Sequence, residues 1–247
     1  MFKIATIFSC AICAMILSAC GGGGGSTAQP QAASVQPAST VPATPNVVTI
    51  SAQGDSTMAG YETVNGVGTV TANSAPAMLQ AQLRATLGND SITVQNNALS
   101  GTNTYQLLNG LSPYIRTLAA FLPIDSQAQI WICNFAINDA RSYTTDQYGQ
   151  YLTQWVATVR AAGRIAILEE PNPTTDSSVP DLRPYVAMMD YVATQMNVPI
   201  VQQYSYIQSL PLWQTMLTDG IHPNDALYAI KAQREAEVLT PIVRSLQ

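Results

Sequence analysis

Short apolar and β-branched runs alternate with longer segments of helical spacing from residue 46 to residue 247. Two parallel strands cannot be joined by a tight turn, so each pair needs a crossover connection, which is usually a helix. Strands that alternate with helices therefore indicate a mostly parallel sheet covered by helices on both faces. The pattern predicts one three-layer α/β/α sandwich over residues 46–247, with five strands in a mostly parallel sheet.

The strands and helices of this sandwich can be placed along the chain. Strands are expected at residues 47–52, 92–95, 129–134, 165–169 and 200–203. Helices are expected at residues 76–87, 146–162 and 182–196, and a last helix is expected from a cap at Asn224 to about residue 244. Pro241 should bend or break that last helix, because proline lacks the N–H that a helix interior uses.

The first residues have the pattern of an export signal. Lys3 is followed by an apolar run over residues 5–16 and by small residues before Cys20. Leu17-Ser18-Ala19-Cys20 resembles the bacterial lipobox, in which cleavage leaves a cysteine that receives acyl chains. We expect a signal peptide over residues 1–19, a lipidated Cys20, and a flexible tether rich in Gly, Ser and Pro over residues 20–45. The expected location is the bacterial cell envelope, as an exported lipoprotein of the outer membrane or facing the periplasm.

Composition excludes several classes of function. The chain of 247 residues has a net charge of −5 and only 10% charged residues, so no basic surface is available for nucleic acid. His222 is its one histidine, and Cys133 is its one cysteine after Cys20. A single histidine and a single cysteine cannot supply the nitrogen and sulfur ligands of a usual zinc centre. We therefore expect no metal, no cofactor and no disulfide in the folded domain.

Groups able to carry chemistry follow the predicted strands. In an open parallel sheet, ligands bind beyond the carboxyl ends of the strands, so these positions converge in space. The segments are Gly54-Asp55-Ser56-Thr57 after the first strand, Asn97-Ala98-Leu99-Ser100-Gly101 after the second, Asn138-Asp139 after the third, and Asp219-Gly220-Ile221-His222 before the last helix.

A serine nucleophile explains this set of residues. A serine hydroxyl is a poor nucleophile until a positioned base removes its proton. Since His222 is the one histidine, it is the candidate base, and Asp219 lies three residues before it, where a carboxylate can fix the tautomer of the ring. Adjacent strand residues point to opposite faces, so the Glu169-Glu170 pair is unsuited to the paired-carboxylate chemistry of a glycosidase.

These segments resemble the four blocks of the SGNH hydrolases, also called the GDSL family, over essentially all of residues 47–247. The resemblance implies a flavodoxin-like α/β/α sandwich with Ser56 as nucleophile and Asp219 and His222 as the orienting carboxylate and the base. It also implies an oxyanion hole formed by the backbone N–H groups of Ser56 and Gly101 and by the side-chain amide of Asn138. The family usually has Gly two residues before this Asn, where the present chain has Ala136.

Each of these residues also has an ordinary structural role open to it. Ser56 can be the N-cap of the helix after the first strand, because serine is favoured there. Gly101 can supply a positive φ in a turn, and Asn138 can close a turn on its own backbone. His222 can be an ordinary surface or core histidine.

The sequence thus predicts a serine esterase that hydrolyses carboxylic esters, O-acetyl esters among them, through an acyl-enzyme. Its expected partners are an ester-bearing small molecule, glycan or lipid, and a membrane that holds the N-terminal lipid anchor. Two other functions remain open at this point. One is an acyltransferase that uses the same triad on an envelope glycan, and the other is a non-catalytic lipoprotein that binds envelope glycan.

Overall fold

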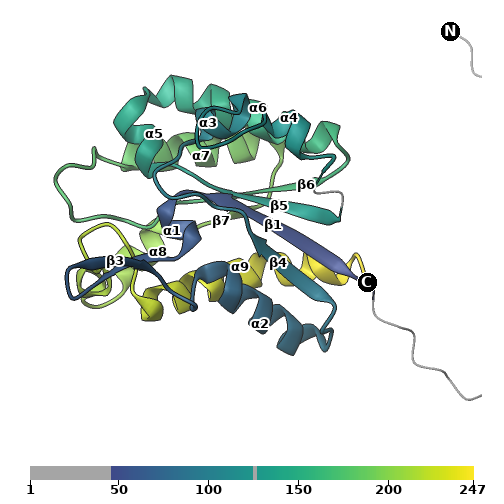
Figure 1. Cartoon of the computed structure of the whole chain (residues 1–247), viewed down its shortest axis with the longest axis horizontal. Coiled ribbons are helices and arrows are strands. Elements are labelled where there is room, and N and C mark those ends of the chain that lie inside the picture. The colour runs from purple at the N-terminus through teal and green to yellow at the C-terminus, as the bar shows by residue number, and fades with distance from the viewer. Residues whose placement is uncertain (1–45, 125–126) are drawn as a thin grey trace, which may run out of the picture. The chain divides into compact units, whose positions relative to one another are not determined.

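The computed structural model describes residues 46–124 and 127–247 (Figure 1). The expected signal peptide, Cys20 and the tether lie outside the described residues. Within the described ranges, no helix is both long enough and apolar enough to cross a membrane.

A five-stranded parallel sheet forms the centre of the domain. The strands are β1 (Val48–Gly54), β4 (Ile92–Asn96), β5 (Ala128–Asn134), β6 (Ile165–Glu169) and β7 (Ile200–Val201). Their order is β4-β1-β5-β6-β7, and every neighbouring pair is parallel. This order places the second strand before the first, as in flavodoxin-like sheets. The predicted fold class is confirmed, although the last strand is two residues long rather than four.

Helices cover both faces of the sheet (Figure 1). One face carries α2 (Ala75–Leu87) and α9 (Asp225–Arg244), and the other carries α3 (Thr104–Asn109), α4 (Leu118–Phe121), α5 (Ile137–Ser142), α6 (Thr145–Ala161) and α7 (Arg183–Met196). The remaining helices are α1 (Ser56–Ala59), α8 (Tyr204–Ser209) and the 3₁₀ turn η1 (Trp213–Met216). The three layers are those predicted from the alternation of strands and helices.

Alternate residues of each strand belong to two separate cores. Ile130 and Ile132 of β5 pack in the core beneath α2 and α9, whereas Trp131 and Cys133 pack in the core beneath α6 and α7. All four are fully buried, because successive side chains of a strand point to opposite faces. A strand covered on both faces is therefore apolar along nearly its whole length.

Helix α9 corrects one expectation from the sequence. Pro241 does not end this helix, which continues to Arg244. Leu239 and Val243, on either side of the proline, are completely buried in the core beneath α2 and α9. Packing of these two side chains thus outweighs the backbone hydrogen bond that proline cannot make.

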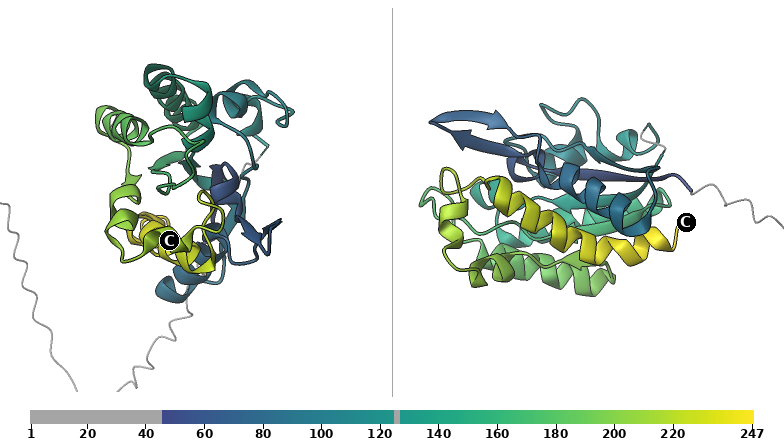
Figure 2. Two further views of the ribbon diagram at one scale, coloured as in Figure 1. Left: turned by 90° about the vertical axis from the view of Figure 1, so that its left-hand side faces the viewer. Right: turned by 90° about the horizontal axis from the view of Figure 1, so that it is seen from below.

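A small hairpin outside the main sheet was not predicted. Its strands β2 (Tyr61–Val64) and β3 (Val67–Val70) are antiparallel and directly follow α1. They project beyond the helices in the view from below (Figure 2). Asn65 and Gly66 connect them with φ of 51° and 78°. Asn-Gly between two short β-branched runs is a strong hairpin signal, so the sequence did contain the information.

Candidate active site

The predicted motifs lie where β1, β4 and β5 end. Ser56 follows β1, Gly101 lies in the loop after β4, and Asn138 lies in α5, just after β5. These three strands are neighbours and parallel, so their carboxyl ends share one edge of the sheet. The Leu99 N–H donates to the Gly54 carbonyl at 3.0 Å, which ties the loop after β4 to the end of β1. The fold thus brings together segments that are far apart in the sequence.

Ser56 is the first residue of the short helix α1. Asp55 is the N-cap of this helix, and its Oδ1 accepts the backbone N–H and the hydroxyl of Thr57, both at 2.9 Å. The capping role considered for Ser56 therefore belongs to Asp55, which leaves the Ser56 hydroxyl available. A Cβ on Gly54 would lie 2.5 Å from the Cβ of Met58, so this tight turn requires glycine there.

Ser56, His222 and Asp219 form a hydrogen-bonded chain. The Oγ of Ser56 lies 2.8 Å from Nε2 of His222, and Nδ1 of His222 lies 2.7 Å from Oδ2 of Asp219. With the proton of the neutral ring on Nδ1, that nitrogen donates to the carboxylate, and Nε2 accepts from the serine hydroxyl. This order of serine, imidazole and carboxylate is the order that acyl transfer through a serine requires.

The Asp219 carboxylate accepts four hydrogen bonds. Its Oδ1 accepts the backbone N–H groups of Ile221 at 3.1 Å and His222 at 2.9 Å, and its Oδ2 accepts the His222 ring and, at 2.8 Å, the Thr63 hydroxyl. Partial burial raises the pKa of Asp219, but these hydrogen bonds, led by those from His222, outweigh it and lower the pKa to about 2. Asp219 therefore stays charged and can stabilise an imidazolium beside it.

The Asp219–His222 turn is held from outside as well. Gly220 has φ of +85°, which favours glycine, and its carbonyl accepts the N–H groups of Thr175 at 2.7 Å and Asp176 at 3.2 Å. The side-chain amide of Asn172 donates to the Ile221 carbonyl at 2.9 Å. The segment after β6 thus holds this turn in place.

Gly101 and Asn138, the predicted oxyanion donors, are linked through Thr102. Gly101 has φ of +80°, and the Asn138 side-chain amide donates to the Thr102 carbonyl at 2.9 Å. This bond uses one of the two N–H groups of the amide. Asn138 therefore does not close a turn on its own backbone. Its hydrogen bond fastens the loop that contains Gly101 to α5.

Asp139 fastens the same loop. Its side chain is fully buried, and the Thr104 N–H lies 3.1 Å from Oδ1 and 3.3 Å from Oδ2. Burial raises the pKa of Asp139 to about 7, although the bonds from Thr104 lower it. The loop after β4 is thus held by two consecutive residues of α5.

Ala136, the departure from the family pattern, does not strain the backbone. Its φ is −174°, which any residue adopts, and its side chain is buried in the core beneath α6 and α7. The position therefore accepts a methyl group as part of the core.

The sequence reading missed two residues of the hairpin that touch the candidate site. Thr63 hydrogen-bonds to Asp219, as described above, and the ring of Tyr61 lies against that of His222, with centroids 4.6 Å apart. Asn65-Gly66 was the available signal for the hairpin, but neither Thr63 nor Tyr61 belongs to a recognisable motif.

A buried charged cluster beside the ends of β5 and β6 was not predicted from the sequence either. The Nζ of Lys231 lies 3.6 Å from Oε1 of Glu169 and 3.5 Å from Oδ1 of Asn134, and Gln203 donates to Glu169 at 2.6 Å. Lys231, Glu169 and Glu235 are all fully buried. Burial raises the pKa of Glu169, and it raises that of Glu235 to about 7. Glu169 is thus committed to internal contacts.

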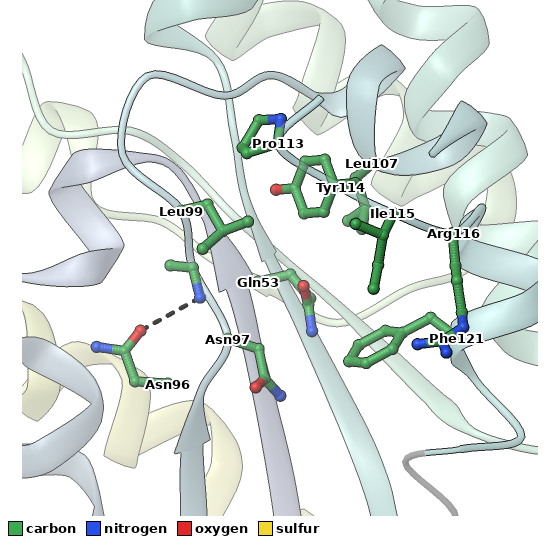
Figure 3. A pocket seen from close by; sticks show the side chains of 11 residues that line it. Gln53, Asn96, Asn97, Leu99, Leu107, Pro113, Tyr114, Ile115, Arg116 and Phe121 are labelled. Atoms are coloured by element: carbon green, nitrogen blue, oxygen red, sulfur yellow. Dashed lines mark hydrogen bonds between the residues drawn. The ribbon is translucent and has the colours of Figure 1, made fainter. Parts of the chain in front are cut away.

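A cavity of about 330 Å³ lies beside the loop after β4 (Figure 3). Leu99 belongs to that loop, and Gln53 of β1 stands at the centre of the view. Tyr114 and Phe121 contribute rings to the wall, and the Tyr114 hydroxyl lies 2.9 Å from that of Thr102. The cavity shares the loop after β4 with the candidate site, but Ser56, Asp219 and His222 do not line it. In residues 46–124 and 127–247, no group of three or more His, Cys, Asp or Glu is placed to hold a metal ion.

Solved structures share this fold. A lipase/acylhydrolase from Enterococcus faecalis is 19% identical, with a TM-score of 0.65, over 79% of this chain and 96% of that one. An acetylxylan esterase from Geobacillus stearothermophilus is 18% identical, with a TM-score of 0.59, over 78% of this chain and 94% of that one. An α/β-hydrolase enzyme from the metagenome of Lake Arreo is 19% identical, with a TM-score of 0.58, over 81% and 96%. No curated protein matches the sequence.

The family model of the GDSL-like lipase/acylhydrolases matches residues 52–230. This range runs from β1 into α9 and includes the Ser56 turn, the loop after β4, and the Asp219–His222 turn. The chain therefore belongs to the GDSL-like lipase/acylhydrolase family and is a serine hydrolase that acts on ester bonds.

Proposed function

We propose that Ser56, His222 and Asp219 are the catalytic triad of an esterase that removes short acyl groups, acetyl above all, from carbohydrate. The observation that carries the triad is the hydrogen-bonded chain from the Ser56 hydroxyl through the His222 ring to Asp219. The choice of carbohydrate rests on the expected envelope location and on the fold shared with an acetylxylan esterase.

The reaction begins at the Ser56 hydroxyl. Nε2 of His222 takes its proton while Oγ forms a bond to the ester carbonyl carbon, and Asp219 stabilises the imidazolium that results. The tetrahedral intermediate collapses as the bond to the sugar oxygen breaks, and the His222 proton passes to that oxygen. Water then attacks the acyl-enzyme through the same steps, with His222 as the base, which releases the carboxylic acid and restores Ser56.

Negative charge develops on the carbonyl oxygen in both halves of the reaction. The backbone N–H groups of Ser56 and Gly101 and the second N–H of the Asn138 amide are the proposed donors to it. Preorganised donors stabilise the transition state because they need no rearrangement during the reaction. The hydrogen bond from Asn138 to Thr102 supports this role by holding the amide in place.

Labelling with a fluorophosphonate tests the triad directly. The full-length protein in detergent should gain a single adduct by intact mass, and Ser56→Ala should gain none. Ser177→Ala, a change at an exposed serine, is the matched control and should label fully. Absence of an adduct on folded wild-type protein would favour a non-catalytic glycan-binding lipoprotein instead.

A ladder of esters tests the acyl group. The protein should hydrolyse acetyl esters of oligosaccharides and should lose activity on aryl esters as the acyl chain lengthens. A preference for long chains would overturn the carbohydrate assignment in favour of a lipid ester. Product analysis with an acceptor sugar present separates hydrolysis, which yields free acid, from transfer, which yields a new ester.

We also propose that the protein is anchored at the bacterial cell envelope through acyl chains on Cys20. The signal-like residues 1–19 and the lipobox-like residues before Cys20 support this location. Growth with an alkyne fatty acid should label the wild-type chain, and Cys20→Ala should lose the label. Cys133→Ala, which changes a buried cysteine of the folded domain, should keep it.

A further inference from the structure

The β2–β3 hairpin touches the Asp219–His222 turn through side chains that lie outside the family's four blocks. The Thr63 hydroxyl donates to Oδ2 of Asp219 at 2.8 Å, the same oxygen that accepts the His222 ring. Among the described residues, Thr63 is the one side chain outside residues 219–222 that hydrogen-bonds to this carboxylate. We propose that Thr63 is a positioning residue, through which the hairpin holds Asp219 and His222 in their reactive arrangement. This inference rests on the proposed triad.

A second bond from Thr63 fixes the start of the same turn. The Thr63 backbone N–H donates to the Thr218 hydroxyl at 2.9 Å, and that hydroxyl donates to the His222 carbonyl at 3.1 Å. Thr218 also donates its own N–H to the His222 carbonyl at 2.8 Å. One residue of the hairpin thus holds both the carboxylate and, through Thr218, the backbone of His222.

Tyr61 restricts the ring of His222 from the same strand. The two rings are tilted by 56° with their centroids 4.6 Å apart. The phenol of Tyr61 occupies the space where a Cβ on Gly68 would lie, so the opposite strand needs glycine to admit this ring. The Tyr61 carbonyl accepts the Tyr228 hydroxyl at 2.6 Å, which joins this end of the hairpin to α9.

The base of the hairpin is fastened to the first residue of α9. Oδ1 of Asp225 accepts the Thr71 hydroxyl at 2.7 Å, and its Oδ2 accepts the Asn73 amide at 2.6 Å. The hairpin begins directly after α1, which contains Ser56, and is fixed to α9, which follows His222. It therefore connects the segment of Ser56 with that of His222, and its Thr63 hydroxyl supplies the contact with Asp219.

Thr63→Val tests this assignment, since valine keeps the shape and the backbone N–H but removes the hydroxyl. We expect kcat to fall ~10-fold with KM nearly unchanged, because a lost hydrogen bond to a charged group has roughly this effect on a rate. The rate of fluorophosphonate labelling should fall by the same factor. Thr63→Ser, which restores a hydroxyl, should recover most of both rates.

Thr69→Val is the matched control. Thr69 pairs with Glu62 rather than with Thr63, so its side chain lies on the opposite face of the hairpin. Thr69→Val should keep wild-type kinetics. Its thermal unfolding temperature should equal that of Thr63→Val. Equal losses in the two valine variants, wild-type rates in Thr63→Val, or failure of serine to rescue would each overturn the assignment. Failure of the wild-type protein to label would instead overturn the proposed triad, so the two results are distinct.

Discussion

Asp219 and Asp139 belong to the two halves of the candidate site and are held in opposite ways. Asp219 is part of the relay to Ser56, is partly exposed, and accepts four hydrogen bonds, which lower its pKa to about 2. Asp139 fastens the loop that contains Gly101, is fully buried, and has a pKa raised to about 7 by that burial.

The difference shows which physical effect decides the charge of a carboxyl group. Hydrogen bonds to the charged form lower a pKa, and desolvation raises it, so the balance of the two sets the charge. Asp219 works as a permanent negative charge beside His222. Asp139 needs no charge for its role, because it acts by accepting a backbone N–H from Thr104. The variants below test this division, from the largest expected effect to the smallest.

Loss of the proposed nucleophile should have the largest effect. Ser56→Ala is expected to lower kcat on an aryl acetate by up to ~10⁶-fold, because loss of the nucleophile has about this effect in a serine hydrolase. Its unfolding temperature should stay near that of the wild type, since Ser56 does not cap α1. Activity above one hundredth of the wild-type value would show that a different residue attacks the ester.

Loss of the charge at Asp219 should rank second. Asp219→Asn keeps the shape but cannot hold His222 in the required tautomer, so kcat should fall on the order of 10⁴-fold. Steady-state kinetics at several pH values measure this. A loss as small as that of Asn138→Ala would mean that the carboxylate does not orient the ring.

Protonation of Asp139 should make the free energy of unfolding depend on pH. Its pKa in the folded chain, about 7, is above the usual 3.8, so the folded state keeps a proton that the unfolded chain has released. The free energy of unfolding is therefore highest below about pH 4, and it falls by about 4 kcal/mol as pH rises to about 7. Glu170 and Glu235, whose pKa values burial raises to about 7, act in the same direction.

Urea unfolding between pH 4 and 8 measures this change. Asp139→Asn cannot titrate, so its free energy of unfolding should fall less steeply with pH than that of the wild type. Asp146→Asn, at an exposed position in α6, is the control and should leave the slope unchanged. Identical slopes in wild type and Asp139→Asn would show that Asp139 is charged in the folded state.

Loss of the Asn138 amide should lower catalysis less than loss of Ser56 or of the charge at Asp219. Asn138→Ala is expected to lower kcat ~10²- to 10³-fold, the usual effect of removing one oxyanion donor. KM should change little, because the charge that the amide stabilises develops only in the transition state. A loss equal to that of Ser56→Ala would mean that Asn138 does more than donate this bond.

Much of the fold could be predicted because local sequence and tertiary structure agree there. The strand at residues 165–169 was placed at its observed bounds, since its apolar run is buried on both faces. Pro241 shows the opposite case, in which a local preference against helix was overruled by the packing of Leu239 and Val243. Sequence alone does not show what the neighbours of a proline bury.

The candidate site divides in the same way. Ser56, Asp219 and His222 could be chosen from the sequence because the chemistry needs these residue types and the chain has one histidine. Thr63 could not be chosen, because a threonine in a short strand has no distinguishing pattern until the hairpin is placed against residue 219. Lys231 and Glu235 were also hidden, since charged side chains in a helix are expected at the surface.

The sequence by itself determined the alternation of strands and helices, the position of the motifs after the strands, and the types of residue available for acyl transfer. These depend on short-range periodicity and on chemistry, which a single chain displays directly. Only the tertiary structure decided that the Ser56 hydroxyl meets His222 and that the β2–β3 hairpin holds Asp219. The contacts of Ser56 with His222 and of Thr63 with Asp219 join residues 166 and 156 positions apart, and their geometry is set by how the layers pack together.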